Sequence, residues 1–200
     1  MRVQVSPGVW VAQAWQPPPS AHPTDRRAMA SQPAWRRAER LAARGLLRQL
    51  LSEIAPESAQ ARLVPTRNGK PMLAGWPTVG VSISHDGSAV AAAVAVDGQV
   101  GVDVQLPIHR PSDRIARRCL RERAPELDDL PPDQRALELA WVWSVQEACV
   151  KADGTGIAGR PWAIDVPVRP HTGRWGRLRW IALRDNCTVP VSCAYGGARC

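Results

Sequence analysis

The chain has 200 residues and 44% hydrophobic content, enough for one large domain or two small ones. Its 26 basic and 18 acidic residues give a formal charge of +8, which suits a nucleic acid, an acidic protein or a polyanionic small ligand. No apolar run approaches the ~20 residues of a membrane helix, and the N-terminus lacks the apolar core of a signal peptide, so we expect a soluble, cytoplasmic protein.

The first predicted elements are a strand, a loop and a helix. Residues 9–12 are predicted as a short strand, and the proline-rich residues 16–24 as an exposed loop, because proline fits neither a helix interior nor a central strand. Residues 35–54 predict a long amphipathic helix with leucines at three- and four-residue spacing. Most of its arginines take the opposite face, where solvent is their simplest partner: Arg36, Arg37, Arg40, Arg44 and Arg48.

The clearest β region covers residues 79–105. Small and apolar residues alternate at its start, up to a turn at residues 85–88. A second strand is expected at residues 89–96, after which Asp97-Gly98 is a strong two-residue hairpin signal. The third strand is therefore expected to pair with the second.

This predicted hairpin sets the register of its third strand. Asp103 would lie opposite Ala92, and the alternation of side chains puts Asp103 and Gln105 on one face. His85 would lie at the sheet end where Gln105 emerges, about 15 Å from Asp103 by strand geometry. A metal near Asp103 and a cation near His85 would suit a long ligand with phosphates at two places.

A second long helix and two strands complete the chain. Asp133 is a good N-cap for a helix that runs to about Ala152, and Gly154 closes it. The strands are expected at residues 178–183 and 188–195. This order of elements predicts an α+β protein with mostly antiparallel sheet.

The cysteines carry a separate prediction. They are odd in number and form no CxxC pair, which predicts free thiols in a reducing compartment and argues against a zinc site. They are Cys119, Cys149, Cys187, Cys193 and Cys200.

Chemistry concentrates on Asp103, Glu147 and Lys151. Two carboxylates can share a hard metal ion, and a lysine one helical turn beyond the second can pair with phosphate. Glu147 and Lys151 equally suit an exposed salt bridge between residues four apart, which stabilises a helix by only about 0.3 kcal/mol. Asp103 in a valine-rich strand needs water, a partner or a metal. Taken singly, these residues leave both interpretations open.

Lysine itself is informative in this chain. Lys70 and Lys151 are the only lysines, beside 24 arginines. Lysine presents a compact, flexible point charge where arginine presents a rigid planar fork. We therefore expect both positions to need the point charge.

Several short segments occur in a fixed order: Gly69-Lys70-Pro71, Ser82-Ile83-Ser84-His85, Gly101-Val102-Asp103, residues 143–151 and Gly154-Thr155-Gly156. In this order and spacing they resemble the 4′-phosphopantetheinyl transferase superfamily, in its larger, surfactin-synthetase-activating type. The helix with Arg44 also resembles the family's N-terminal helix. The resemblance covers most of residues 35–165.

The resemblance implies a fold. Two similar α/β subdomains would lie in a pseudo-twofold arrangement, each a mostly antiparallel sheet with one long packed helix. Residues 1–100 would form the N-terminal subdomain, on the adenosine and 3′-phosphate side of coenzyme A. Residues 101–200 would form the C-terminal subdomain, which holds the metal. Two halves in one chain imply a monomer.

The resemblance also implies a reaction, the Mg²⁺-dependent transfer of the 4′-phosphopantetheine arm of coenzyme A to a serine of an acyl or peptidyl carrier protein. The pathway would be polyketide, nonribosomal peptide or fatty acid synthesis. Asp103 and Glu147 would hold the metal, Lys151 would pair with phosphoryl oxygens, and Glu147 would be the base, directly or through a bound water. The implied coenzyme A contacts are Lys70, Pro71, Ser84, His85, Arg44, Arg37 and Lys151.

The chain departs from the family pattern at two positions. Gln105 stands where the family often has an acid, which leaves a two-carboxylate metal site in which Gln105 would hold a water. Gln146 stands where a lysine usually precedes the motif glutamate. That change puts a carrier or phosphate contact in doubt, but not the metal.

Residues 108–130 resemble the family's region for docking the acidic carrier, which a chain of charge +8 would attract. Its candidate contacts are Arg114, Arg117, Arg118, Arg121 and Arg123, although a solvated basic helix explains any one of them nearly as well. Two alternatives remain. One is a non-catalytic coenzyme A- or carrier-binding relative. The other, a basic nucleic-acid-binding protein, lacks any recognisable binding signature, so we expect neither a nucleic acid nor a membrane as partner.

Overall fold

The computed structural model describes residues 1–109 and 111–197. The first half comprises β1 (Arg2–Ser6), β2 (Val9–Trp15), α1 (Pro23–Met29), α2 (Ala34–Ile54), β3 (Leu63–Pro65), β4 (Pro71–Leu73), β5 (Gly80–Asp86) and β6 (Ala89–Ala95). The second comprises β7 (Gln99–Val104), α3 (Asp113–Leu120), α4 (Pro132–Asp153), β8 (Thr172–Trp175), β9 (Leu178–Ala182) and β10 (Val191–Gly196). Short 3₁₀ turns lie at Pro56–Ser58, Arg121–Leu127, Gly156–Gly159 and Pro161–Ala163.

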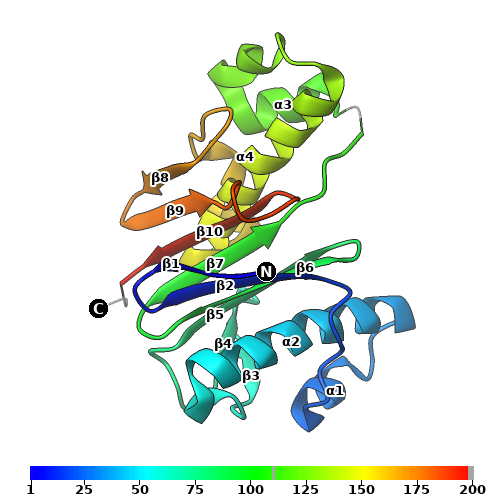
Figure 1. Cartoon of the computed structure of the whole chain (residues 1–200), viewed down its shortest axis with the longest axis vertical. Coiled ribbons are helices and arrows are strands. Elements are labelled where there is room, and N and C mark those ends of the chain that lie inside the picture. Colours follow the sequence, from blue (N-terminus) through cyan, green and yellow to red (C-terminus); the bar gives the residue numbers. More distant parts are fainter. Residues whose placement is uncertain (110, 198–200) are drawn as a thin grey trace.

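Two four-stranded antiparallel sheets form the centre of the molecule, in the orders β1-β2-β6-β5 and β7-β10-β9-β8. Helix α2 packs on the outer face of the first sheet and α4 on the outer face of the second, so the layers run helix, sheet, sheet, helix (Figure 1). The α+β fold, with antiparallel sheets and packed long helices, is thereby confirmed. The domain boundary between residues 100 and 101 stays a prediction.

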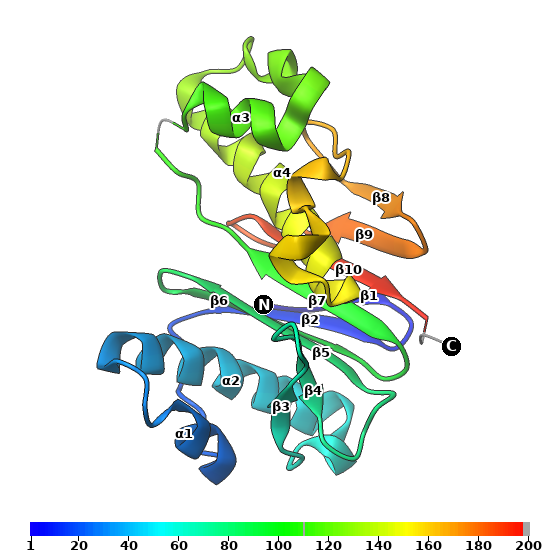
Figure 2. The ribbon, with the colours of Figure 1, turned by 180° about the vertical axis from the view of Figure 1, so that it is seen from behind.

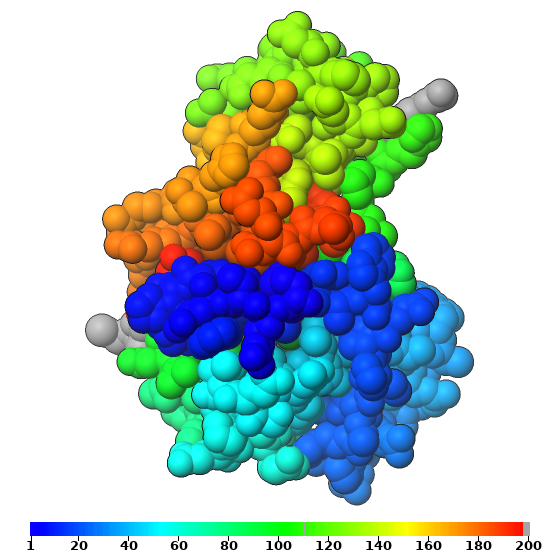
Figure 3. All heavy atoms as spheres, viewed as in Figure 1, coloured from blue at the N-terminus to red at the C-terminus, as the bar shows by residue number. Residues whose placement is uncertain are grey.

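The core between the two sheets explains the unbroken apolar run of β6, whose residues are all buried. On one face, Val90, Ala92 and Val94 pack with the leucines of α2. On the other face, its alanines pack with Val100 and Val102 of β7. A strand covered on both faces carries such a run instead of an alternating pattern. In Figure 3 the first strands (dark blue) lie as a band between the C-terminal strands (orange and red) and the segments coloured cyan.

The predicted hairpin between β6 and β7 is wrong. Strand β6 pairs with β5 and β2, whereas β7 pairs with β10, so Asp103 lies opposite Ser192 and not Ala92. At the Asp97-Gly98 turn the chain leaves the first sheet for the second. Gly98 adopts φ +127° and donates its backbone N–H to the carbonyl of Thr78. Glycine tolerates this conformation, so the turn serves a crossover as well as it serves a hairpin.

Both long helices are confirmed close to their predicted bounds. Helix α4 ends at Gly154, in the left-handed conformation with φ +78°, as expected. Its N-cap is Pro131 and not Asp133. The exposed loop predicted for residues 16–24 is a loop only as far as residue 22, and Pro17 and Ser20 within it are buried. Pro23 begins α1, because proline suits the first turn of a helix, where its missing N–H costs nothing.

Candidate active site

Helix α4 crosses strand β7 at Gly101. A Cβ atom at this position would collide with the backbone of Ala148 and Ala152, so only glycine lets the helix backbone approach this closely. The approach brings Lys151 of α4 to Asp103 of β7, where its Nζ donates to Oδ1 at 2.6 Å. The glycine of the Gly-Val-Asp segment therefore positions the site.

Asp103 is buried, with only 5% of its surface exposed. Its Oδ1 also accepts a hydrogen bond of 2.7 Å from the hydroxyl of Ser84 on β5, and Lys151 Nζ donates to that same hydroxyl at 2.9 Å. Its Oδ2, in contrast, is buried without a hydrogen-bond partner, the only such carboxylate oxygen among residues 1–109 and 111–197. A buried polar atom without a hydrogen-bond partner is costly, so Oδ2 is suited to a cation.

The acids of this site have altered pKa values. Burial raises the pKa of Asp103, against the opposing effect of the Lys151 ammonium group. Burial, and then the nearby charge of Asp103, raise the pKa of Glu147, while Lys151 lowers it. Two buried acids with raised pKa values would both be stabilised as anions by a shared divalent ion.

A polar cavity of ≈ 570 Å³ lies between α2, β5, α4 and the β3–β4 hairpin. It is lined by six of the sequence-predicted site residues: Arg44, Lys70, Pro71, His85, Glu147 and Lys151. Ser84 and Asp103 lie buried behind its wall, bound to Lys151. The expected separation of about 15 Å between His85 and Asp103 is too long, because Ser84, the residue before His85, contacts Asp103 directly.

The β3–β4 hairpin is tied to the C-terminal end of α4, which Figure 2 shows beside it. Lys70 Nζ donates to the carbonyl of Ala152 at 2.5 Å, and Asn68 Nδ2 donates to that of Gly154 at 3.1 Å. The last carbonyls of a helix carry partial negative charge and favour a cation there. Lys70 thus joins the two halves at the edge of the cavity.

The two arginines predicted to contact coenzyme A line different cavities. Arg44 lines the cavity, but its Nη1 donates to Asp25 at 2.8 Å, so its side chain is partly engaged. Arg37 lies outside it and lines a separate hollow beside Pro17 and Gly87. His85 lies on the cavity wall, with Nδ1 4.0 Å from a carboxylate oxygen of Glu39. Burial lowers the pKa of His85, against the opposing effect of Glu39.

Gln105 follows β7 and binds the last residue of β5. Its Nε2 donates to Asp86 Oδ2 at 2.9 Å and to the carbonyl of Leu106 at 3.2 Å. Sequence reasoning took Asp86 for a turn residue only, and no local signal revealed this contact. In the described ranges, no group of three or more His, Cys, Asp or Glu residues is arranged to hold a metal, so a metal here would rely on Asp103, Glu147 and non-protein ligands.

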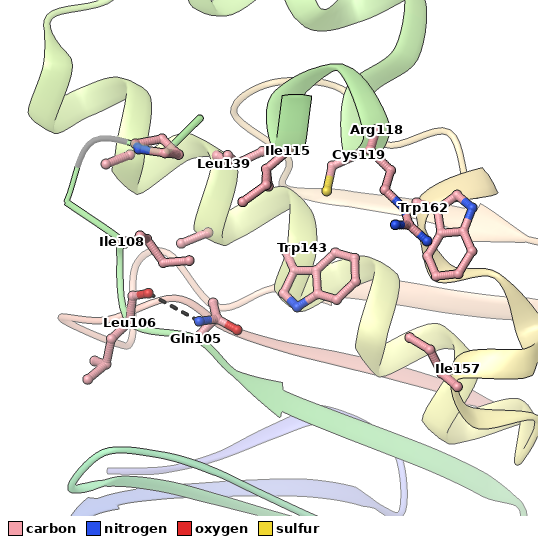
Figure 4. Close-up of a pocket in the computed structure, with 13 residues that line it drawn as sticks. Gln105, Leu106, Ile108, Ile115, Arg118, Cys119, Leu139, Trp143, Ile157 and Trp162 are labelled. Carbon is pink, nitrogen blue, oxygen red and sulfur yellow. Dashed lines mark hydrogen bonds between the residues drawn. The ribbon is translucent and has the colours of Figure 1, made fainter. Parts of the chain in front are cut away.

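Gln105 also lines a second, apolar cavity of ≈ 450 Å³. Figure 4 shows Trp143 at its centre, with Gln105 on one side and Arg118 and Trp162 on the other. The Arg118 guanidinium stacks 3.9 Å from the centre of the Trp162 ring. Trp143 stands one helical turn before Glu147, so one stripe of α4 contributes a side chain to each of the two cavities.

Gln146 is fully buried beneath the apolar cavity. Its Nε2 donates to the carbonyls of Cys119 and Ile164, at 2.7 and 2.8 Å. These bonds join α3 and the segment after Trp162 to α4. In this chain the position therefore supports the walls of the cavity.

Four cysteines, Cys119, Cys149, Cys187 and Cys193, are free thiols; Cys200 lies outside the described residues. Across residues 1–109 and 111–197, no helix combines the length and the hydropathy needed to span a bilayer.

A family model described as the 4′-phosphopantetheinyl transferase superfamily matches residues 99–194. The 4′-phosphopantetheinyl transferase AcpT of Escherichia coli O157:H7 is 34% identical over 133 residues, 64% of this chain and 62% of the relative. The transferase HetI of a Nostoc species is 29% identical over 167 residues, 76% of this chain and 69% of the relative. The transferase psf-1 of Bacillus pumilus is 31% identical over 118 residues, 56% of this chain and 48% of the relative.

The match thus spans less than two thirds of the length of AcpT and about half that of psf-1. The matched region nonetheless contains β7 with Asp103, and α4 with Glu147 and Lys151. The part of the chain that carries Asp103, Glu147 and Lys151 thus matches the 4′-phosphopantetheinyl transferase superfamily, and its relatives carry the same name.

Proposed function

We propose that this protein transfers the 4′-phosphopantetheine arm from coenzyme A to a serine hydroxyl of an acyl or peptidyl carrier protein, with Mg²⁺. The serine oxygen forms a bond to the phosphorus next to the pantetheine arm, and the bond from that phosphorus to the bridging pyrophosphate oxygen breaks. Adenosine 3′,5′-bisphosphate leaves, and the serine proton passes to a base. The observation that carries the proposal is the buried, unpartnered Oδ2 of Asp103, whose other oxygen is bound to Lys151 at the polar cavity that Glu147 also lines.

The donor set suits Mg²⁺, which binds through one or two carboxylates and takes its other ligands from water and substrate phosphates. Asp103 Oδ2 and Glu147 would hold the ion, and the carboxamide oxygen of Gln105 would hold one of its waters. The bound ion would supply positive charge that stabilises the leaving pyrophosphate oxygen.

Lys151 and Glu147 have further roles in the proposed reaction. An ammonium group has three N–H donors. Lys151 uses two, for Ser84 and Asp103, and we assign the third to a phosphoryl oxygen on which charge develops. Glu147 is the candidate base, because burial raises its pKa toward the range in which a carboxylate accepts a proton effectively.

Coenzyme A would occupy the polar cavity. His85, Lys70 and Pro71 line it together with Arg44, which supports a place there for the adenosine and the 3′-phosphate. Arg37 lines another hollow, so it would contribute only to the electrostatic field outside the cavity.

The carrier would dock over the apolar cavity and α3. Ile108, Ile115 and Ile157 line this cavity with much of their surface exposed. Of the candidate arginines, Arg123 pairs with Asp165 and Glu126, and Arg118 stacks on Trp162. The remaining ones, Arg114, Arg117 and Arg121, are exposed and suited to the acids of a carrier.

We further propose that the protein acts as a monomer in the cytoplasm, where its free thiols would stay reduced. The carrier would belong to polyketide, nonribosomal peptide or fatty acid synthesis.

The proposal is tested by incubating the protein with Mg²⁺, coenzyme A and a series of purified apo carriers, and following the carrier by intact-protein mass spectrometry. A phosphopantetheine arm should appear on the carrier only when coenzyme A and the metal are both present. No gain of mass on any carrier, although the protein binds coenzyme A, would instead support a non-catalytic relative and contradict the proposal.

A further inference from the structure

Two serines of β5 reach across to β7, which belongs to the other sheet. Ser82 Oγ accepts the backbone N–H of Val102 at 3.0 Å, and Ser84 Oγ donates to Asp103 Oδ1 at 2.7 Å. Both serines are buried, with 3% and 7% of their surface exposed. These two hydroxyl contacts connect strands that share no ladder of backbone hydrogen bonds.

The hydroxyl of Ser84 is fully engaged as a donor. A serine hydroxyl has one hydrogen, and here Asp103 Oδ1 accepts it. Lys151 Nζ donates to the hydroxyl oxygen of Ser84 and so occupies one of the acceptor positions of that oxygen. A phosphate oxygen needs a donor, and the side chain of Ser84 has none left to offer while it holds Asp103.

We infer that Ser84 is a positioning residue for the metal ligand Asp103, and not a contact to the 3′-phosphate of coenzyme A. Together with Lys151, Ser84 fixes Oδ1 and thereby leaves Oδ2 as the oxygen that binds the metal. The two oxygens of one carboxylate thus have separate tasks. This inference rests on the proposed function, because it needs a divalent ion at Asp103.

The neighbouring serine supplies a matched control. Ser82→Ala removes a buried hydroxyl of the same strand that also bonds to β7, but to a backbone N–H and not to Asp103. Both alanine variants lose one contact between the sheets. Only Ser84→Ala loses the bond that orients the carboxylate. A general loosening of the sheets would therefore weaken metal binding in both variants, whereas loss of the positioning bond would weaken it in Ser84→Ala alone.

The first measurement is the Kd of Mn²⁺ for the full-length protein without substrates, by titration calorimetry. Loss of a hydrogen bond that orients a metal ligand weakens metal binding by roughly 10- to 100-fold. We expect a roughly 10-fold rise in Kd for Ser84→Ala, since Lys151 still holds Oδ1. We expect no change for Ser82→Ala. Thermal unfolding of both variants verifies that they are folded.

The second measurement compares the affinity for coenzyme A with that for 3′-dephospho-coenzyme A. If Ser84 does not contact the 3′-phosphate, Ser84→Ala keeps the wild-type ratio of the two affinities. His85→Ala, which alters a cavity-lining side chain, should reduce that ratio.

Equal Mn²⁺ affinity in the wild type and Ser84→Ala would overturn the positioning role, and so would loss of the 3′-phosphate preference in Ser84→Ala. Carrier modification by the wild type would still stand in either case. A wild-type protein that binds no Mn²⁺ would overturn the metal site itself and this inference with it.

Discussion

Two buried aspartates, one in each half of the molecule, differ in how their oxygens are used. Asp25 of α1 is wholly buried, and both of its oxygens are occupied. Arg44 and Arg48 donate to Oδ1 at 2.8 and 3.1 Å, and Ser20 and Arg48 donate to Oδ2 at 2.8 and 3.0 Å. Asp103 receives two hydrogen bonds on Oδ1 and none on Oδ2.

The pKa values of the two acids move in opposite directions. Burial alone would raise the pKa of Asp25, but hydrogen bonds from Arg48, Ser20 and Arg44 outweigh it, and the pKa lies below its ordinary value. At Asp103 burial prevails and the pKa is raised. A buried acid whose partners all come from the protein joins parts of the fold, whereas one with an unpaired oxygen is suited to a ligand.

The largest expected effect is that of Asp103→Asn on catalysis. This change removes the charge of the proposed metal ligand and keeps its shape. Metal stabilisation of a transition state amounts to several kcal/mol, so we expect kcat/KM to fall about a thousandfold or more. Steady-state kinetics on an apo carrier measures the effect. A fall of less than tenfold would contradict the metal role of Asp103.

The same substitution at the other acid should act on stability. Asp25→Asn deprives the largely buried Arg44 and Arg48 of their anion, and loss of one partner of a buried ion pair costs about 3 kcal/mol or more. We expect the free energy of unfolding to fall by about 3 kcal/mol, measured by urea denaturation. The folded fraction should still modify carrier. A stability equal to that of the wild type would show that the arginines do not depend on Asp25.

Acid should remove the difference in the free energy of unfolding between the wild type and Asp25→Asn. Because the pKa of Asp25 is lowered on folding, its contribution is fully present above its unfolded pKa, about 3.9. That contribution is lost as the pH falls through the still lower folded pKa. Urea unfolding of both proteins, from about pH 6 to about pH 3, should therefore show the two stabilities converging. A difference that persists undiminished would mean that the charge of Asp25 is not what stabilises the fold.

The smallest expected effect concerns an arginine that, unlike Arg44 and Arg48, is exposed on α3. Arg117→Glu should raise KM for an acidic carrier several-fold at low salt, an effect equivalent to about 1 kcal/mol, and added salt should reduce it. The matched control is Arg177→Glu, an exposed arginine in the turn between β8 and β9. Equal effects of the two variants would indicate general attraction and not docking at α3.

The sequence predicts elements well where one local signal sets them. The leucine spacing of α2 and the glycine that ends α4 are signals of this kind. The sequence could not predict which strand pairs with β7, because Asp97-Gly98 fits a hairpin and a crossover equally well. Strands β1 and β8 also lacked a clear local signal.

The candidate site likewise has features that the sequence reveals and features that only the structure reveals. Asp103, Glu147 and Lys151 follow from motif order, and the polar cavity brings Glu147 and Lys151 together with Lys70 and His85. The partners of Asp25 depend on contacts between α1 and α2 that no spacing encodes, so Arg44 and Arg48 resembled solvated arginines. The unpartnered Oδ2 of Asp103 likewise becomes visible only in three dimensions.

The most direct test of the account treats both acids in one experiment. Asp25→Asn and Asp103→Asn are incubated with Mg²⁺, coenzyme A and an apo carrier at equal concentrations of folded protein, and the mass of the carrier is followed with time. Asp25→Asn should add the phosphopantetheine arm, whereas Asp103→Asn should leave the carrier unmodified. Full modification by Asp103→Asn would contradict the account.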